Sequence, residues 1–343
     1  MNGALRAGKV RTRGARVPVR TFSVCLGLAA VAFAASVLVI GSGDLPIPSA
    51  DVVRTLTGEG TQVHRFIVTE LRLPRALTGI LVGLALGLSG AVFQSLSRNP
   101  LGSPDLIGFT TGAATGALVQ ILVVGGGTVA IAVSSVGGAV LTGMAVYLLA
   151  YRGGGMQGHR LVLVGVGIAA MLEALNSYLI TRAELREAYQ AAFWLTGSLE
   201  GRDWDHVKAL GVALAVLVPF TLALGGRLRM VELGDDVARS LGERVEQSRG
   251  LAVAGGVGLV AVATAASGPV AFVALAAPQL ARRLTRGSGP QLLPSALMGA
   301  ALLVVSDLIA LRLPVRLPVG VVTSVLGGVY LVWLLGIEGR RER

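Results

Sequence analysis

Charged residues are scarce in this chain of 343 residues. Asp, Glu, Lys and Arg together make up 14% of the sequence, whereas hydrophobic residues make up 53% and the mean hydropathy is +0.72. An average soluble protein carries roughly 25% charged residues. The shortage of charge excludes an ordinary soluble domain and indicates a protein embedded in the lipid bilayer.

Residues of metal and covalent chemistry are just as rare. The one cysteine, Cys25, lies in an apolar segment, so an internal disulfide is excluded. The three histidines, His64, His159 and His206, are scattered and belong to no His-Glu-x-x-His motif, Cys/His cluster or Ser-His-Asp set. We therefore predict no metal site, no bound cofactor and no catalytic residues.

Lysine occurs only twice, at Lys9 and Lys208, and neither belongs to a Gly-x-x-x-x-Gly-Lys-Ser/Thr motif. In P-loop enzymes that motif holds the phosphates of ATP through its backbone N–H groups and its lysine. The chain is therefore not expected to hydrolyse ATP in this manner.

The net charge of +11 would suggest nucleic-acid binding if the basic residues were spread evenly, but they are not. No acidic residue occurs before Asp44, and a basic segment before the first apolar run holds an N-terminus in the cytoplasm. The run at 23–40 is too long for a signal-peptide core and lacks a small-residue cleavage site. We predict no nucleic-acid partner and a basic cytoplasmic tail at 1–22, which contains Arg6, Lys9, Arg11, Arg13, Arg16 and Arg20.

The apolar runs predict about ten transmembrane helices, since a full crossing needs about 20 residues. An even number of crossings returns the C-terminus to the cytoplasm. We place the transmembrane domain at 23–336, its cytoplasmic loop at 226–249 and a cytoplasmic tail at 337–343. The predicted segments are Ser23–Ile40, Arg75–Leu96, Leu106–Val124, Val129–Ala150, Leu161–Ile180, Val207–Leu224, Gly250–Ala265, Val270–Leu284 (short and interrupted), Leu292–Leu311 and Val319–Leu335.

Glycine is abundant, and its 48 residues concentrate within the apolar runs. In a bilayer, small residues at helical spacing let another helix backbone approach closely. Within the stretch 71–117, the apolar run 76–96 has this pattern. It is followed by a break at 98–105, where Pro100 and Pro104 prevent the helix from continuing. The glycines at this spacing are Gly79, Gly83, Gly87 and Gly90.

A set of short sequence motifs lies within matching segments that extend from about Arg72 to Leu335. They are LPR at 73–75, SGAVFQ at 89–94, RNPL at 98–101, GA at 112–113, FWLTGSL at 193–199, LGDD at 233–236, SGPVAFV at 267–273 and LPVGVVT at 317–323. Together they resemble the signature of the iron–siderophore and vitamin B12 ABC transporter permease family. The phrases NPLGSPD at 99–105 and IGF at 107–109 are most similar to ferric-enterobactin permease subunits.

The resemblance implies an all-α polytopic membrane protein with the type II ABC importer permease fold, built as an inverted repeat. The similarity between 89–93 and 267–272 agrees with such a repeat. The implied function is the permease subunit of an ATP-driven importer for ferric siderophores, enterobactin-like catecholates above all, in the bacterial cytoplasmic membrane. The implied partners are two copies of an ABC ATPase that binds ATP and Mg²⁺, a sister permease or a second copy of this chain, and an extracytoplasmic siderophore-binding protein.

Other functions stay open at this point. The cargo could instead be cobalamin or haem, and an ion-coupled secondary transporter would need no ATPase at all. Transport that depends on an ATPase would exclude the ion-coupled secondary transporter. The resemblance to enterobactin-type subunits favours a heterodimer with a sister chain over a homodimer.

The loop 226–249 carries the predicted ATPase contact. Residues 231–242 read as one short amphipathic helix, with acids near its start and Arg239 near its end, in agreement with the helix dipole. The resemblance implies a coupling helix that fits a groove of the ATPase; the alternative is a surface helix with no partner. The expected coupling residues are Leu233, Gly234, Asp235, Ala238, Leu241 and Gly242.

Two further groups of residues are candidates. In the family, arginines at the outer mouth receive acidic residues of the binding protein, which points to Arg72, Arg75, Arg312 and Arg316; interfacial snorkelling is the alternative. Glu173 and Asn176, three residues apart on a predicted helix face, could line the translocation pathway or form a structural hydrogen bond. Asp307 is interpreted as structural, and Gln279 stands where many relatives carry histidine.

Overall fold

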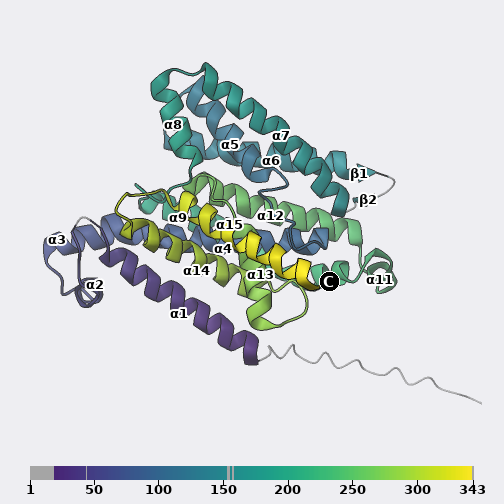
Figure 1. Cartoon of the computed structure of the whole chain (residues 1–343), viewed down its shortest axis with the longest axis horizontal. Coiled ribbons are helices and arrows are strands. Elements are labelled where there is room, and N and C mark those ends of the chain that lie inside the picture. The colour runs from purple at the N-terminus through teal and green to yellow at the C-terminus, as the bar shows by residue number, and fades with distance from the viewer. Residues whose placement is uncertain (1–18, 44, 153–154, 157, 342–343) are drawn as a thin grey trace, which may run out of the picture.

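The computed structural model describes residues 19–43, 45–152, 155–156 and 158–341, so most of the predicted N-terminal tail lies outside the described residues. Long helices run side by side, and short helices lie at two opposite ends of the bundle (Figure 1). The elements are α1 (Val19–Gly41), α2 (Ser49–Leu56), α3 (Gln62–Arg65), η1 (Phe66–Arg72), α4 (Leu73–Ser97), α5 (Phe109–Val119), η2 (Gln120–Val124), α6 (Thr128–Ala150), β1 (Tyr151–Arg152), β2 (Gly155–Met156), α7 (Gly158–Arg182), α8 (Leu185–Leu195), α9 (Trp204–Ala223), α10 (Gly225–Glu232), α11 (Asp235–Ser240), α12 (Val245–Ser267), α13 (Val273–Thr285), α14 (Leu292–Arg312) and α15 (Val319–Arg341).

The all-α polytopic architecture is confirmed. Among the described residues, 7 helices are long and apolar enough to cross a membrane: α1, the continuous helix Gln62–Ser97, α6, α7, α9, α12 and α14. Shorter apolar helices span Phe109–Val124 and Val319–Trp333. The eighth predicted segment is short, as expected, because α13 has only 13 residues and contains Pro278.

Some predicted helix bounds were wrong. The second segment was expected to begin at Arg75, after Pro74, yet the helix extends unbroken from Gln62. The π-helical stretch η1 lies directly before α4, so Pro74 is the second residue of the regular α-helix. At that position the missing N–H of proline removes no intrahelical hydrogen bond, and the helix continues. The last helix likewise continues to Arg341, beyond the predicted end at Leu335.

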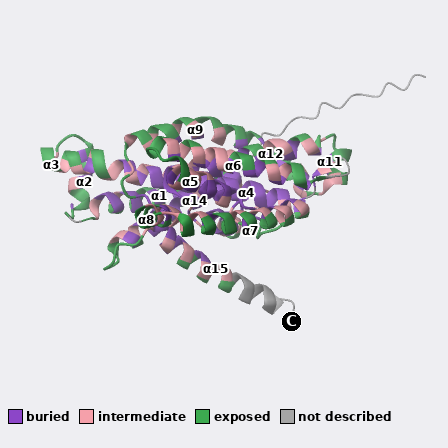
Figure 2. Cartoon of the chain, turned by 90° about the horizontal axis from the view of Figure 1, so that it is seen from above, coloured by how far each residue is buried: buried purple, intermediate pink, exposed green. Residues whose placement is uncertain are grey.

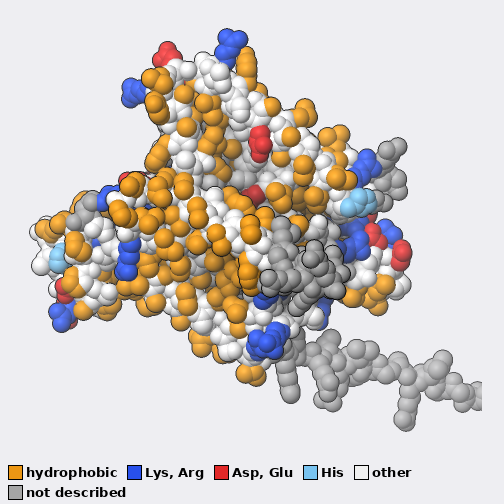
Figure 3. Space-filling view, viewed as in Figure 1, with side chains coloured by type: hydrophobic (Ala, Val, Ile, Leu, Met, Phe, Trp, Pro, Cys, Tyr) orange, Lys and Arg blue, Asp and Glu red, His pale blue; other side chains and the backbone are white. Residues whose placement is uncertain are grey.

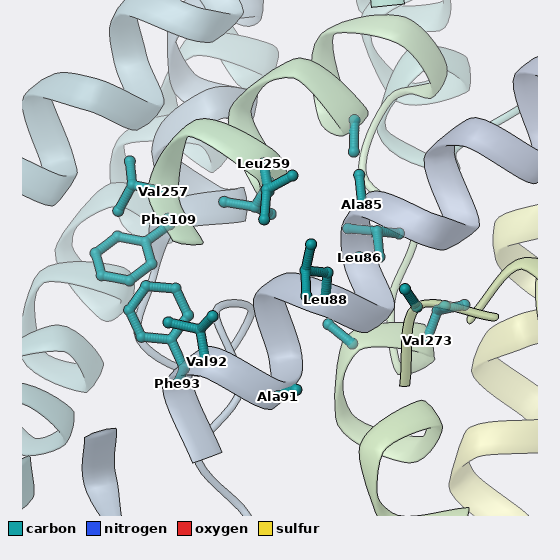
Figure 4. Packing of buried hydrophobic residues seen from close by; sticks show 14 of the residues in the cluster. Ala85, Leu86, Leu88, Ala91, Val92, Phe93, Phe109, Val257, Leu259 and Val273 are labelled. Atoms are coloured by element: carbon teal, nitrogen blue, oxygen red, sulfur yellow. The ribbon is translucent and has the colours of Figure 1, made fainter. Parts of the chain in front are cut away.

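Helix α4 forms the centre of the bundle. Every residue from Ala85 to Leu96 is buried, and α9, α12, α13 and α14 pack around it (Figure 2). Its aliphatic side chains meet Val257 and Leu259 of α12, while Phe93 packs on Phe109 of α5 with 4.9 Å between ring centroids (Figure 4). By contrast, α7 and α9 expose most of their surface.

The glycines of α4 bring neighbouring backbones into direct contact. A β-carbon on Gly87 would lie 2.2 Å from the carbonyl oxygen of Ser295 in α14, and one on Gly90 would lie 1.8 Å from that of Ala274 in α13. Helices α5 and α6 meet in the same way, because a β-carbon on Gly116 would lie 2.1 Å from the carbonyl oxygen of Ser134. The predicted role of glycine in close helix packing is thus confirmed for Gly83, Gly87 and Gly90, whereas Gly79 faces the side chains of Leu199 and Val304.

We predict that Gly90→Ala destabilises the fold by at least about 2 kcal/mol, in the upper part of the range of roughly 1–3 kcal/mol for overpacked cores. The obstructing atom belongs to the backbone and cannot rotate away. Gly137→Ala in α6 is the matched control, since its β-carbon would have no atom within 4 Å. Thermal unfolding of the purified protein in detergent measures both variants, and equal melting temperatures would contradict this account.

Candidate functional sites at the two ends of the bundle

The candidate residues lie at opposite ends of the bundle. Helix α11 and the β1–β2 hairpin stand at one end, where α15 also finishes, and α2 and α3 stand at the other (Figure 1). Hydrophobic side chains cover most of the visible face between the ends, while charged side chains gather mainly toward them (Figure 3). We call the α11 end the coupling end and the α2–α3 end the docking end.

At the coupling end, the predicted single helix 231–242 is wrong. The chain forms two helices, α10 and α11, separated at Leu233 and Gly234. Gly234 has φ +109°, a conformation that glycine adopts without strain and that a continuous helix excludes. Gly242 closes α11 with φ +84°. The two glycines therefore shape a helix–turn–helix unit.

This unit presents apolar side chains outward. Leu233 is 61% exposed, Val237 46% and Leu241 61%. We call these three residues the apolar stripe. Ala238, which was expected to contact a partner, is instead fully buried within the chain. Its small side chain lets α11 lie close to the rest of the coupling end.

Ion pairs attach the unit to the bundle. The Asp235 carboxylate accepts hydrogen bonds from Arg249 at 2.7 Å and from Arg98 at 3.3 Å. At the end of α10, Glu232 accepts a hydrogen bond from the Ser95 hydroxyl at 2.7 Å and lies 3.6 Å from Arg282 of α13. Arg98, Arg249 and Glu232 were not among the coupling residues predicted from the sequence.

At the docking end, Arg72 and Arg75 are hydrogen-bonded to other groups of their own chain. The Arg72 guanidinium donates to the carbonyl oxygens of Ile40 (2.9 Å) and Leu45 (2.7 Å), where α1 ends. Arg75 forms a two-point ion pair with Asp307 of α14, at 3.0 and 2.7 Å, and the Asp307 side chain is 1% exposed. The structural interpretation of Asp307 agrees with this pair, and the partly exposed Arg72 and Arg75 both bind groups of their own chain.

The other two arginines are exposed. Arg312 is the last residue of α14, and Arg316 lies in the loop before α15. A charged side chain on the surface forms ion pairs with a partner only weakly, by about 0–1 kcal/mol each. Arg312 and Arg316 are the more exposed members of the predicted set, and Arg316 also interacts within the chain.

Glu173 and Asn176 lie three residues apart in the regular helix α7 and so share a helix face, as expected, but they differ in burial. Asn176 is 7% exposed and continues the buried stripe of α7 that includes Leu161, Gly165 and Ala169. Glu173, which lies beside this stripe on the same helix, is exposed. Of the pair, only Glu173 lies on an open surface of this chain.

Buried polar groups also fill the break after α4. Gln279 donates through Nε2 to the Gln94 side chain (3.1 Å) and to the carbonyl oxygen of Pro100 (2.6 Å), so it joins α13 to the break. Asp105 accepts a hydrogen bond from the Thr110 hydroxyl at 2.6 Å. Burial raises the pKa of the Asp105 carboxyl, and the hydrogen bonds to it oppose that rise.

Within the described ranges, no group of three or more His, Cys, Asp or Glu side chains is arranged to hold a metal ion.

Comparison with known proteins places these features in a family. The FecCD transport family model matches residues 28–336. The ferric enterobactin transport system permease protein FepG of Escherichia coli (strain K12) is 42% identical over 325 residues, covering 94% of this chain and 98% of FepG. The cobalamin import system permease protein BtuC of Halobacterium salinarum is 32% identical over 297 residues, covering 86% and 80%.

A solved structure has the same fold. It is described as an inward-facing conformation of an ABC transporter of metal-chelate type, and it superposes with a TM-score of 0.80 at 27% identity over 92% of this chain and 99% of that one. The family match and the relatives each extend over nearly the whole chain. This multi-pass membrane protein therefore belongs to the FecCD transport family.

Proposed function

We propose that this chain is the permease subunit of an ATP-driven importer for ferric siderophores of the enterobactin type, in the bacterial cytoplasmic membrane. The observation that carries the proposal is the 42% identity to FepG over 94% of this chain. Uptake of ferric enterobactin into proteoliposomes that contain the complete complex tests it. Uptake must require ATP, which an ion-coupled carrier would not, and unlabelled cobalamin should not compete for it.

The ATP is hydrolysed by two copies of a separate ATPase subunit, which also bind Mg²⁺. The apolar stripe supports a contact with that subunit at the coupling end. Three aliphatic side chains exposed beside one short helix gain free energy when a partner removes them from water, at roughly 25 cal/mol per Å² of apolar surface. Both termini of the chain are then cytoplasmic, as predicted from the basic N-terminal segment.

We predict that Leu241→Glu lowers the amount of ATPase that co-purifies with the permease about tenfold, because a carboxylate would have to be buried without a partner. Ser240→Glu is the matched control, since Ser240 is exposed on the same helix and the variant adds the same charge. Quantified pull-down from membranes measures both. Similar losses for the two variants would indicate a charge effect and contradict an apolar contact.

The docking end is proposed to receive the acidic surface of a siderophore-binding protein. Arg312 is the best candidate because it is exposed at the end of α14. Arg72 contributes indirectly, since its bonds to Ile40 and Leu45 hold the end of α1 in place. Opposite charges accelerate association more than they increase affinity.

We predict that Arg312→Glu slows association of the binding protein several-fold at low salt and flattens the dependence of the rate on salt. Arg286→Glu is the control, because Arg286 is an exposed arginine that follows α13 on the side of the coupling end. Surface plasmon resonance over a salt series measures the rates. An unchanged rate and salt slope for Arg312→Glu would show that Arg312 anchors the chain at the membrane interface only.

The translocation pathway is proposed to lie against the open face of α7, between this chain and a sister permease. Glu173 supports this, since a carboxylate at membrane depth costs at least about 2.5 kcal/mol unless it faces protein or water. The exposed Val166, two helical turns before Glu173 on the same face, gives this face an otherwise apolar character.

We predict that cells expressing only this chain and the ATPase yield no transport-competent complex, because the resemblance to FepG-type subunits favours a heterodimer. Adding a homologous sister permease should restore both a stable complex and ATP-dependent uptake. Size-exclusion chromatography and uptake assays measure the two outcomes. A stable, active complex without a sister chain would establish a homodimer instead.

A further inference from the structure

One buried arginine at the coupling end was not among the functional residues predicted from the sequence. Arg249 lies in the second turn of α12, is 1% exposed, and is the largest fully buried side chain among the described residues. A guanidinium stays charged at any physiological pH, so its burial requires acceptors on several sides.

The acceptors come from three separate elements. Arg249 Nη2 donates to Asp235 of α11 at 2.7 Å, and Nη1 donates to Glu246 of α12 at 3.4 Å and to the carbonyl oxygen of Met156 in β2. Glu246 in turn accepts a hydrogen bond from the backbone N–H of Met156 at 2.8 Å. A single side chain therefore joins α11, the hairpin and α12.

The cluster is balanced in charge. Arg98 lies 3.3 Å from Asp235, and Arg239 lies 3.6 Å from Asp236 and 4.0 Å from Glu246. Three arginines, including Arg249, thus face three carboxylates. Such a self-neutralising, partly buried network is suited to holding its own elements together rather than to attracting a charged partner.

Helix α11 depends on attachments of this kind. It has only six residues and lies between Gly234 and Gly242, both with positive φ. A helix of this length does not maintain its own orientation in water. Asp235, its first residue, is the residue through which it meets Arg249 and, through Arg98, the end of α4.

We propose that Arg249 is the positioning residue of the coupling end: acting through Asp235, it fixes the apolar stripe relative to the hairpin, α12 and α4. The inference rests on the proposed function in one respect. When an ATPase displaces the apolar stripe, Arg249 transmits that displacement to the bundle. Arg249 itself touches neither the ATPase nor the cargo.

Arg249→Lys tests the proposal with minimal disturbance, because it keeps the charge but cannot reach three acceptors in the planar geometry of a guanidinium. The first readout is the mobility of a spin label on Leu241→Cys in a Cys25→Ser background, with the full chain in nanodiscs. We expect a clearly more mobile label with Arg249→Lys and no change with Arg286→Gln, an exposed arginine outside the cluster.

The second readout is the number of cargo molecules transported per ATP hydrolysed by the complete complex. We expect Arg249→Lys to lower it at least about fivefold, the low end of typical coupling effects. Asp235→Asn should act in the same direction, and the double variant should lower the ratio by less than the product of the two single effects, since both variants weaken the shared Arg249–Asp235 contact. If Arg249→Lys does not fold, both label mobility and transport stoichiometry are measured on Asp235→Asn instead.

The outcomes separate the two hypotheses. A wild-type complex without ATP-dependent uptake overturns the proposed function, while the spin-label experiment still tests the role of Arg249. A functional wild type, combined with unchanged label mobility and unchanged stoichiometry in Arg249→Lys and Asp235→Asn, overturns the positioning role alone.

Discussion

Direct backbone contact around α4 is the constraint on which the rest of the bundle depends. Apolar side chains gain little by leaving lipid for a protein interior, so close packing must supply the attraction between helices in a membrane. Gly87 and Gly90 supply it by letting α14 and α13 touch the α4 backbone. Once α4 is enclosed in this way, its two ends stand in fixed positions relative to four neighbouring helices.

The charged side chains inside the bundle lie where close helix packing excludes water. Arg75 near the start of α4 meets Asp307, and Ser95 near its end meets Glu232, so each end of the helix is tied to a different neighbour. In such surroundings a paired charge is held firmly, while removing one partner leaves an uncompensated ion. The polar contacts thus fix which elements meet, and the glycines provide the attraction.

Local patterns in the sequence were sufficient for the fold class, and they pointed to candidate residues that lie at both ends of the bundle. They failed where a side chain finds a partner far along the chain: Arg75 and Asp307 are 232 residues apart, and no periodicity links them. Gly234 is different, because a glycine inside an amphipathic pattern could have signalled the break between α10 and α11. Arg249 carried a comparable signal, since an arginine three residues after Glu246 at the start of an apolar run needs an acceptor.

The arrangement of these contacts limits how a displacement at the coupling end can reach the docking end. Helix α11 is too short and α10 too peripheral to extend across the bundle, but Arg98 and Ser95 join both to the end of α4. Because α4 is buried throughout its second half, it cannot bend there without separating backbones that are in contact. A displacement must therefore move α4 together with α13 and α14 as one unit. That unit ends at Arg75, Asp307 and Arg312, so α4 and α14 connect the two candidate ends of the bundle.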